Sequence, residues 1–69
     1  MKGRAQVMEQ VVEERLTPRQ REMIRMRYRG QMRQSEIARE LGVNKSTVSR
    51  TLGRAHRRIR ESLYGTVRR

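Results

Sequence analysis

Apolar residues recur at spacings of three and four along most of the chain, which is the period of an amphipathic α-helix. The first stretch covers residues 6–15, and its apolar positions are Met8, Val11, Val12 and Leu16. We expect the glutamates of this helix on its outer side. The apolar side either covers the other helices or forms the interface of a homodimer, so we assign residues 1–16 to packing or dimerisation.

The second helix is predicted to begin at Pro18. Thr17 suits the N-cap position, proline suits the first helical position, and Gln20 completes a capping box. We expect the helix to end near Gly30, because glycine suits the left-handed conformation that follows a helix end. Its apolar positions are Met23, Ile24, Met26 and Tyr28.

Two further helices are predicted on either side of a very short turn. The third covers residues 34–41 and ends at Gly42, and the fourth starts at Lys45 because Asn44 is a favourable cap. One apolar stripe follows the fourth helix for about five turns, formed by Val48, Leu52, Ala55, Ile59 and Leu63. Gly65 comes next, where a terminating glycine belongs. The sequence therefore predicts an all-α bundle of about four helices with a long last helix.

The third helix, the short turn and the fourth helix together have the pattern of a helix-turn-helix. Ala38 is small where the second helix of the motif crosses the first, and Gly42 gives the turn its backbone freedom. The expected shared core is Ile37, Leu41, Val43, Val48 and Leu52. A helical hairpin that binds no ligand has the same pattern. We place the helix-turn-helix domain at residues 17–64 and a basic tail at residues 65–69.

The composition limits the functions that the chain can have. It has 69 residues, of which 33% are hydrophobic, and a formal charge of +11. Such a composition is typical of disordered chains, but the helical period favours a folded one. We expect no enzyme, because a chain of this length has no room for an enclosed catalytic pocket.

Several kinds of site are excluded by the residues that the sequence lacks. It has no cysteine and only one histidine, so we expect no metal site and no cofactor, and we assign His56 no role. The longest apolar run is two residues, which predicts neither a membrane span nor a secretory signal. We therefore expect a cytoplasmic protein that contacts no membrane.

The positive charge is concentrated at the end of the chain. Residues 45–69 carry eight basic side chains against Glu61 alone, and most of the basic residues of the protein are arginines. The planar guanidinium matches phosphates and guanine edges better than the ammonium of lysine does. Double-stranded DNA is thus the leading candidate partner.

The sequence resembles region 4 of bacterial sigma factors in four runs within residues 16–63, namely residues 16–24, 35–43, 46–50 and 55–59. The resemblance implies a helix-turn-helix that recognises the promoter −35 element and contacts the flap of RNA polymerase. Arg33 departs from the family pattern, which usually has a capping Ser or Thr there, so we expect Ser35 to cap a later helix start. The sequence has no Phe or Trp, whereas the sigma domain that reads the −10 region is rich in aromatics. We therefore expect a free-standing regulator or one half of a split factor.

The outer side of the fourth helix carries the candidate DNA contacts. Its first turns would enter the major groove, where Arg50 can pair with O6 and N7 of guanine and Lys45, Ser46 and Ser49 are further base contacts. Gly53 would allow close approach of the backbone. The candidate phosphate contacts are Arg33, Arg39, Thr47, Arg54, Arg57, Arg58 and Arg60. Each single arginine has the alternative of being part of a solvated helix face.

Three alternatives to transcription regulation by DNA binding stay open. One is a protein-interaction module that binds RNA polymerase or another regulator. Another is RNA binding through the arginine-rich last helix. The third is a DNA-binding protein of a mobile element, since the run Ser46–Arg50 also resembles the DNA-binding ends of some transposases.

Overall fold

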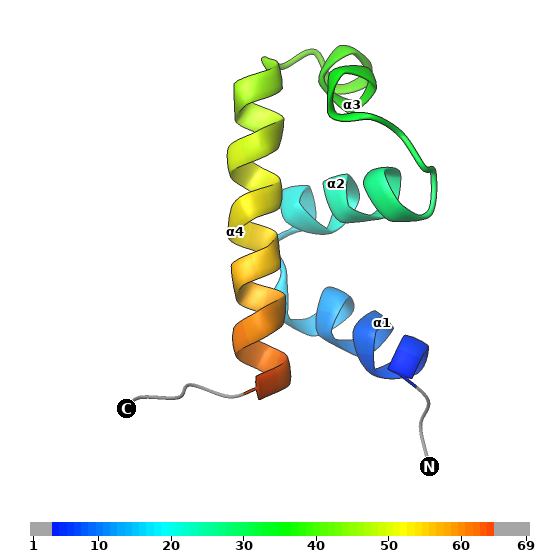
Figure 1. Ribbon diagram of the computed structural model, residues 1–69, viewed down its shortest axis with the longest axis vertical. Helices are drawn as coiled ribbons and strands as arrows, with labels where there is room; N and C mark the ends of the chain where they lie inside the picture. Colours follow the sequence, from blue (N-terminus) through cyan, green and yellow to red (C-terminus); the bar gives the residue numbers. More distant parts are fainter. Residues whose placement is uncertain (1–3, 65–69) are drawn as a thin grey trace.

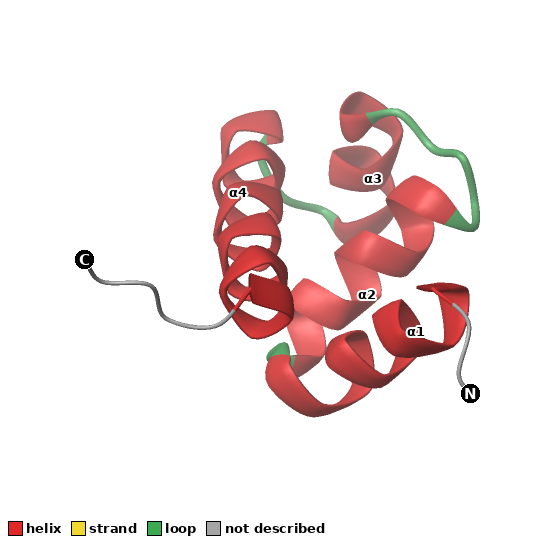
Figure 2. Cartoon of the chain, turned by 60° about the horizontal axis from the view of Figure 1, so that its bottom comes forward, coloured by secondary structure: helices red, strands yellow, loops and turns green. Residues whose placement is uncertain are grey.

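Four helices make up the part of the chain that the computed structural model describes, residues 4–64. They are α1 (Arg4–Arg15), α2 (Pro18–Tyr28), α3 (Gln34–Leu41) and α4 (Lys45–Tyr64). All three shorter helices lie on the same side of the long α4 (Figures 1 and 2). The prediction of an all-α fold with a long last helix is confirmed.

Local contacts set the start of α2 and the end of α3 as the sequence predicts. The hydroxyl of Thr17 accepts from the backbone N–H of Gln20 over 3.2 Å, and the side chain of Gln20 accepts from the backbone N–H of Thr17 over 3.1 Å. This capping box starts α2. Gly42 ends α3 in the left-handed conformation with φ 68°. Asn44 precedes α4, and its carbonyl accepts from the backbone N–H groups of Thr47 and Val48.

The end of α2 differs from the prediction. The left-handed residue after α2 is Gln31, with φ 53°, and not Gly30. Gly30 is required for a different reason, because a Cβ atom there would lie 2.8 Å from the carbonyl oxygen of Met26. Close approach of the backbone, and not a positive φ, therefore selects glycine at this position.

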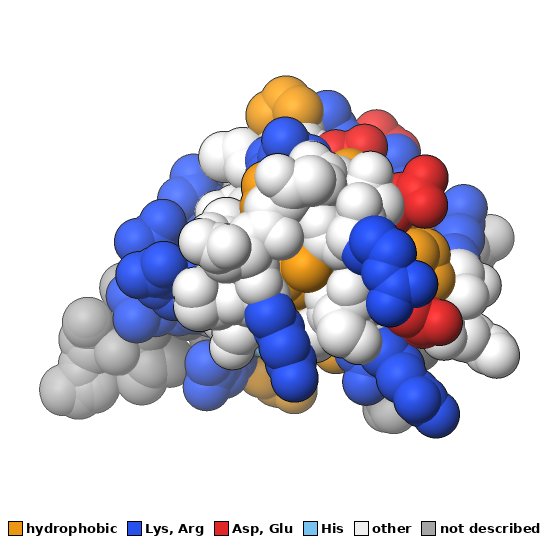
Figure 3. Space-filling view, turned by 90° about the horizontal axis from the view of Figure 1, so that it is seen from above, with side chains coloured by type: hydrophobic (Ala, Val, Ile, Leu, Met, Phe, Trp, Pro, Cys, Tyr) orange, Lys and Arg blue, Asp and Glu red, His pale blue; other side chains and the backbone are white. Residues whose placement is uncertain are grey.

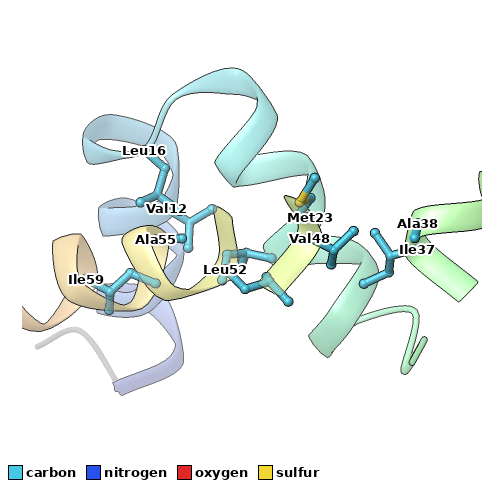
Figure 4. Packing of buried hydrophobic residues seen from close by; sticks show 10 residues of the cluster. Val12, Leu16, Met23, Ile37, Ala38, Val48, Leu52, Ala55 and Ile59 are labelled. Atoms are coloured by element: carbon cyan, nitrogen blue, oxygen red, sulfur yellow. The ribbon is translucent and has the colours of Figure 1, made fainter. Parts of the chain in front are cut away.

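The core lies where α4 meets the three shorter helices (Figure 4). Val48 and Ala55 are completely buried, Leu52 and Ile59 nearly so, and Ile37 of α3 is completely buried against them. The predicted stripe is wrong at Leu63, which is 38% exposed, because the shorter helices do not cover the end of α4. The remaining buried residues are Val12, Leu16, Met23, Ile24 and Ala38, and partly buried Leu41 and Val43 pack against the cluster.

Helix α1 packs against the rest of the chain through apolar and charged side chains. Val12 and Leu16 belong to the core, so this side of α1 faces the same chain. Glu9 and Glu13 are exposed as expected, but their carboxylates also form ion pairs with Arg29 and Arg25. The homodimer of the sequence analysis stays a prediction.

Replacing Gly42, which precedes α4, or Gly53, which lies inside α4, should change the stability of the fold in opposite directions. Gly42 has a positive φ, so Gly42→Ala should lower the free energy of unfolding by about 1–2 kcal/mol. A Cβ at Gly53 meets no atom within 4 Å, so Gly53→Ala should raise that free energy by about 1 kcal/mol through higher helix propensity. Urea unfolding followed by circular dichroism measures both changes, and a shift of the same sign for the two variants would contradict this account.

Candidate nucleic-acid interface

The third and fourth helices pack as a helix-turn-helix. Ile37 and Ala38 of α3 are buried against α4, and a turn of three residues joins the two helices. The small side chain of Ala38 lets the helices approach closely. Because Gly42 is left-handed, the chain leaves the axis of α3 within that turn and α4 starts in a new direction. The start of α4 is thereby fixed next to α3.

The four candidate base contacts all lie on the exposed side of the start of α4. Lys45, Ser46, Ser49 and Arg50 are exposed, whereas Val48 between them is completely buried. Figure 3 looks onto the end of the molecule where α4 begins, and it shows basic side chains without acidic neighbours along the α4 edge, whereas basic and acidic side chains alternate on the opposite side. The buried stripe therefore holds this part of α4 with its polar side outward.

Arg33 and Arg39 place two further exposed cations on the α3 side of the motif. The backbone N–H of Arg33 donates to Oε1 of Glu36 over 2.7 Å, and α3 begins at Gln34. The expectation that Ser35 caps a later start is wrong, because α3 starts at Gln34 with Arg33 at the N-cap position and with the carboxylate of Glu36 holding the backbone N–H of Arg33. The family's usual Ser or Thr is not needed for this start.

The candidate phosphate contacts on α4 are not equivalent. Arg54, Arg57 and Arg60 are exposed and Thr47 is half-buried. Arg58 is different, because its Nε donates to the carbonyl oxygen of Arg15 over 3.0 Å. A cation at this point stabilises the C-terminal end of α1, where carbonyl groups have no partner within the helix.

Sequence reasoning missed a contact between Tyr28 and His56. The Tyr28 hydroxyl lies 2.7 Å from Nε2 of His56, and the two rings meet edge to face with centroids 5.7 Å apart. The guanidinium of Arg27 lies 5.6 Å from the centroid of the Tyr28 ring. His56 thus joins α4 to the end of α2. No local signal predicts the pair, because the two residues are 28 positions apart.

Ion pairs neutralise arginines on α2 and beside it, but not those on α4. Arg19 pairs with Glu22 over 3.2 Å, and Arg25 and Arg29 pair with the glutamates of α1. No basic residue of α4 forms a salt bridge with another residue in the range 4–64. Arg21 and Arg27 of α2 and Arg15 of α1 also form no salt bridge, but most of the described basic residues without one lie on α4 and around α3.

Residues 4–64 hold neither a metal-binding cluster nor a helix that could span a membrane. No group of three or more His, Asp or Glu side chains in this range could hold a metal ion. No helix in it is long and apolar enough to cross a membrane.

Comparison with known protein families gives one match. The family model for sigma-70, region 4 matches residues 14–59, which is more than half of the chain and extends from the end of α1 into α4. No curated protein and no solved structure matches the chain.

The cap at Glu36 can be tested by a pair of substitutions. Glu36→Ala should lower the free energy of unfolding by about 1 kcal/mol, because it leaves the N–H of Arg33 without its acceptor. Glu36→Gln keeps an acceptor oxygen and should retain most of the stability. Equal stability of the alanine variant and the wild type in thermal unfolding would show that the cap is not needed.

Proposed function

Because the chain belongs to the family of sigma-70 region 4 domains, which are DNA-binding helix-turn-helix domains of transcription, we propose that it regulates transcription by recognising promoter or operator DNA. The observation that carries the proposal is the arrangement of α4. Its inner stripe is buried in the core, while four side chains suited to base edges are exposed on its first two turns. We propose binding without catalysis and without a cofactor, in the cytoplasm, where bacterial promoters lie.

In the proposed complex the start of α4 enters the major groove. Arg50 donates both arms of its guanidinium to O6 and N7 of a guanine, and Lys45, Ser46 and Ser49 contact neighbouring bases. Phosphates on either side of the groove are held from α3 and α4. The near phosphate contacts are Arg33, Arg39, Thr47 and Arg54.

Contact with RNA polymerase is the second candidate function. An open depression on α2 favours it, because none of the lining residues, four of which are charged, is a candidate DNA contact. These residues are Pro18, Arg19, Arg21, Glu22, Arg25 and Met26. A polymerase complex that forms without DNA and does not weaken with salt would make polymerase binding the primary function. Preference for RNA hairpins over duplex DNA would instead favour RNA binding.

Base reading by Arg50 is tested by substitution. Selection of bound fragments from random duplex DNA gives the target site, and single base changes in that site then give the discrimination at each position. Arg50→Ala should relax discrimination by about 1–3 kcal/mol at one position, because a bidentate contact to guanine is lost. The matched control is Arg27→Ala, which removes an exposed arginine of α2. If Arg50→Ala weakens binding to all sequences equally, Arg50 contacts phosphate and not a base.

The salt dependence of binding counts the phosphate contacts. With roughly five basic side chains near the backbone, log affinity should fall against log salt concentration with a slope of about −4 to −5. Three of them, Arg33, Arg39 and Arg54, are the charged phosphate contacts, and Lys45 and Arg50 contact bases but also displace counterions because they lie in the groove beside the phosphates. Fluorescence anisotropy of a labelled site duplex at several salt concentrations measures the slope, and a slope near zero would contradict the proposed complex.

A further inference from the structure

Tyr28 and His56 form an exposed polar pair that the proposed complex does not use. The hydroxyl of Tyr28 lies 2.7 Å from Nε2 of His56, so the pair joins the end of α2 to the middle of α4. Tyr28 is 56% exposed, and His56 is exposed as well. A partner molecule can therefore reach both the hydroxyl and the imidazole.

Positive charge surrounds this pair on both helices. On α2, the guanidinium of Arg27 lies 5.6 Å from the centroid of the Tyr28 ring. On α4, Arg60 comes one turn after His56 on the same side of the helix. Arg60 is exposed and forms no ion pair or hydrogen bond with another residue in the range 4–64. An anion bound at the pair would reduce the repulsion among these groups.

No acidic residue of the two helices lies next to the pair. Glu22 is the only acidic residue of α2, and it pairs with Arg19. Glu61 is the only acidic residue of α4, and at five residues from His56 it points about 140° away around the helix axis. The anion that would complement this surface is therefore expected from outside the chain.

The pair lies on a flank of α4 that faces one DNA strand in the proposed complex. The width of the major groove, about 12 Å, accommodates the diameter of a helix, so the two flanks of that helix face the two phosphate backbones. At about 100° per residue, the proposed phosphate contacts Thr47 and Arg54 both lie within about 60° of Arg50 on one flank. His56 lies about 120° from Arg50 on the other flank, and Arg60 lies about 80° from it there. Along the axis, His56 is only about 3 Å beyond Arg54.

We propose that the Tyr28 hydroxyl and the His56 imidazole bind a backbone phosphate of the DNA strand on this flank, and that protonation of His56 strengthens the contact. The inference rests on the proposed function, in which the start of α4 occupies the major groove. It gives the second flank of α4 a phosphate contact, which the proposed complex lacks there. The contact positions the helix and reads no base.

The hydrogen bond within the pair explains the dependence on protonation. A tyrosine hydroxyl has one proton to donate, and a neutral imidazole that accepts at Nε2 takes it. A protonated imidazole donates at both nitrogens, so the hydroxyl accepts from Nε2 and its own proton is free for a phosphate oxygen. Protonation of His56 thus supplies a positive charge and a hydroxyl donor at the same time.

The pH dependence of DNA binding tests the contact, because His56 is the only histidine and the chain has no cysteine. Fluorescence anisotropy measures the affinity of the full chain for the selected site duplex at about pH 7.5 and about pH 5.5. The wild-type affinity should rise by a factor of about 3–10 at the lower pH, and the salt slope should be steeper by about 1. His56→Gln keeps a donor and an acceptor but no titrating group, so it should show neither change. A wild-type affinity that does not respond to pH, or a rise that persists in His56→Gln, would overturn the proposal.

The hydroxyl is tested separately with Tyr28→Phe, which keeps the ring. This variant should bind the site duplex more weakly by a factor of about 3–10 at the lower pH, and by less at the higher pH. Tyr64→Phe is the matched control, since Tyr64 is 72% exposed at the end of α4, and it should bind like the wild type. Circular dichroism at both pH values reports whether the variants are folded. Equal loss of affinity in both variants, or a loss that follows a loss of helix content, would show that the Tyr28 hydroxyl does not contact DNA.

Duplexes in which single phosphates are replaced by uncharged methylphosphonates locate the contact. At a position bound by the pair, the replacement should abolish the pH dependence of the wild type and leave the base preference intact. If no position changes the pH dependence, His56 binds no phosphate and the proposal is wrong. Base preference together with an affinity that is independent of pH would refute this contact alone. If no base preference is found for any duplex, the proposed function itself fails.

Discussion

Burial of one stripe of α4 is the interaction on which the rest of the structure depends. Val48, Leu52, Ala55 and Ile59 form the inner side of the helix, and α1, α2 and α3 all contact α4. Each large side chain of this kind contributes about 1.5–3 kcal/mol when it is removed from water. Because a helix repeats every 3.6 residues, the same burial determines which residues face outward. The exposed direction of Arg50 is therefore a consequence of how the core packs.

The charged contacts modify the surface more than they hold the fold together. Exposed ion pairs such as Glu13 with Arg25 contribute about 0–1 kcal/mol each. Their larger effect is on the distribution of charge, since α1 supplies acidic partners to arginines on and next to α2. The arginines of α4 have no such partners in residues 4–64. The chain thus presents its positive potential on the helix that also carries the candidate base contacts.

Features that depend on neighbours in the sequence were predictable. The capping box of Thr17 and Gln20, the left-handed Gly42 and the inner stripe of α4 up to Ile59 each follow from residues a few positions apart. Features that depend on tertiary structure were not. The contact between Tyr28 and His56 and the ion pairs of α1 bring together distant residues.

For the candidate site, the sequence predicts which side chains are exposed. It does not predict which of them already form hydrogen bonds with distant parts of the chain. Arg58 shows the difference, because its position on α4 predicts an available cation while the carbonyl of Arg15 engages its Nε. The start of α3 is a second example, because Arg33 takes the N-cap position and its backbone N–H donates to the carboxylate of Glu36. Base preference depends on the DNA as well as on the chain, so exposure alone does not give the target sequence.

One side of α4 packs into the core, and we propose that the opposite side binds DNA. Chemical-shift changes of the backbone amides and the arginine Nε–H groups, measured by NMR during titration with the selected site duplex, test it most directly. We predict the largest changes at residues 45–50 and at the start of α3, with small changes over residues 18–26 of α2. Largest changes on α2, with the start of α4 unaffected, would contradict the account.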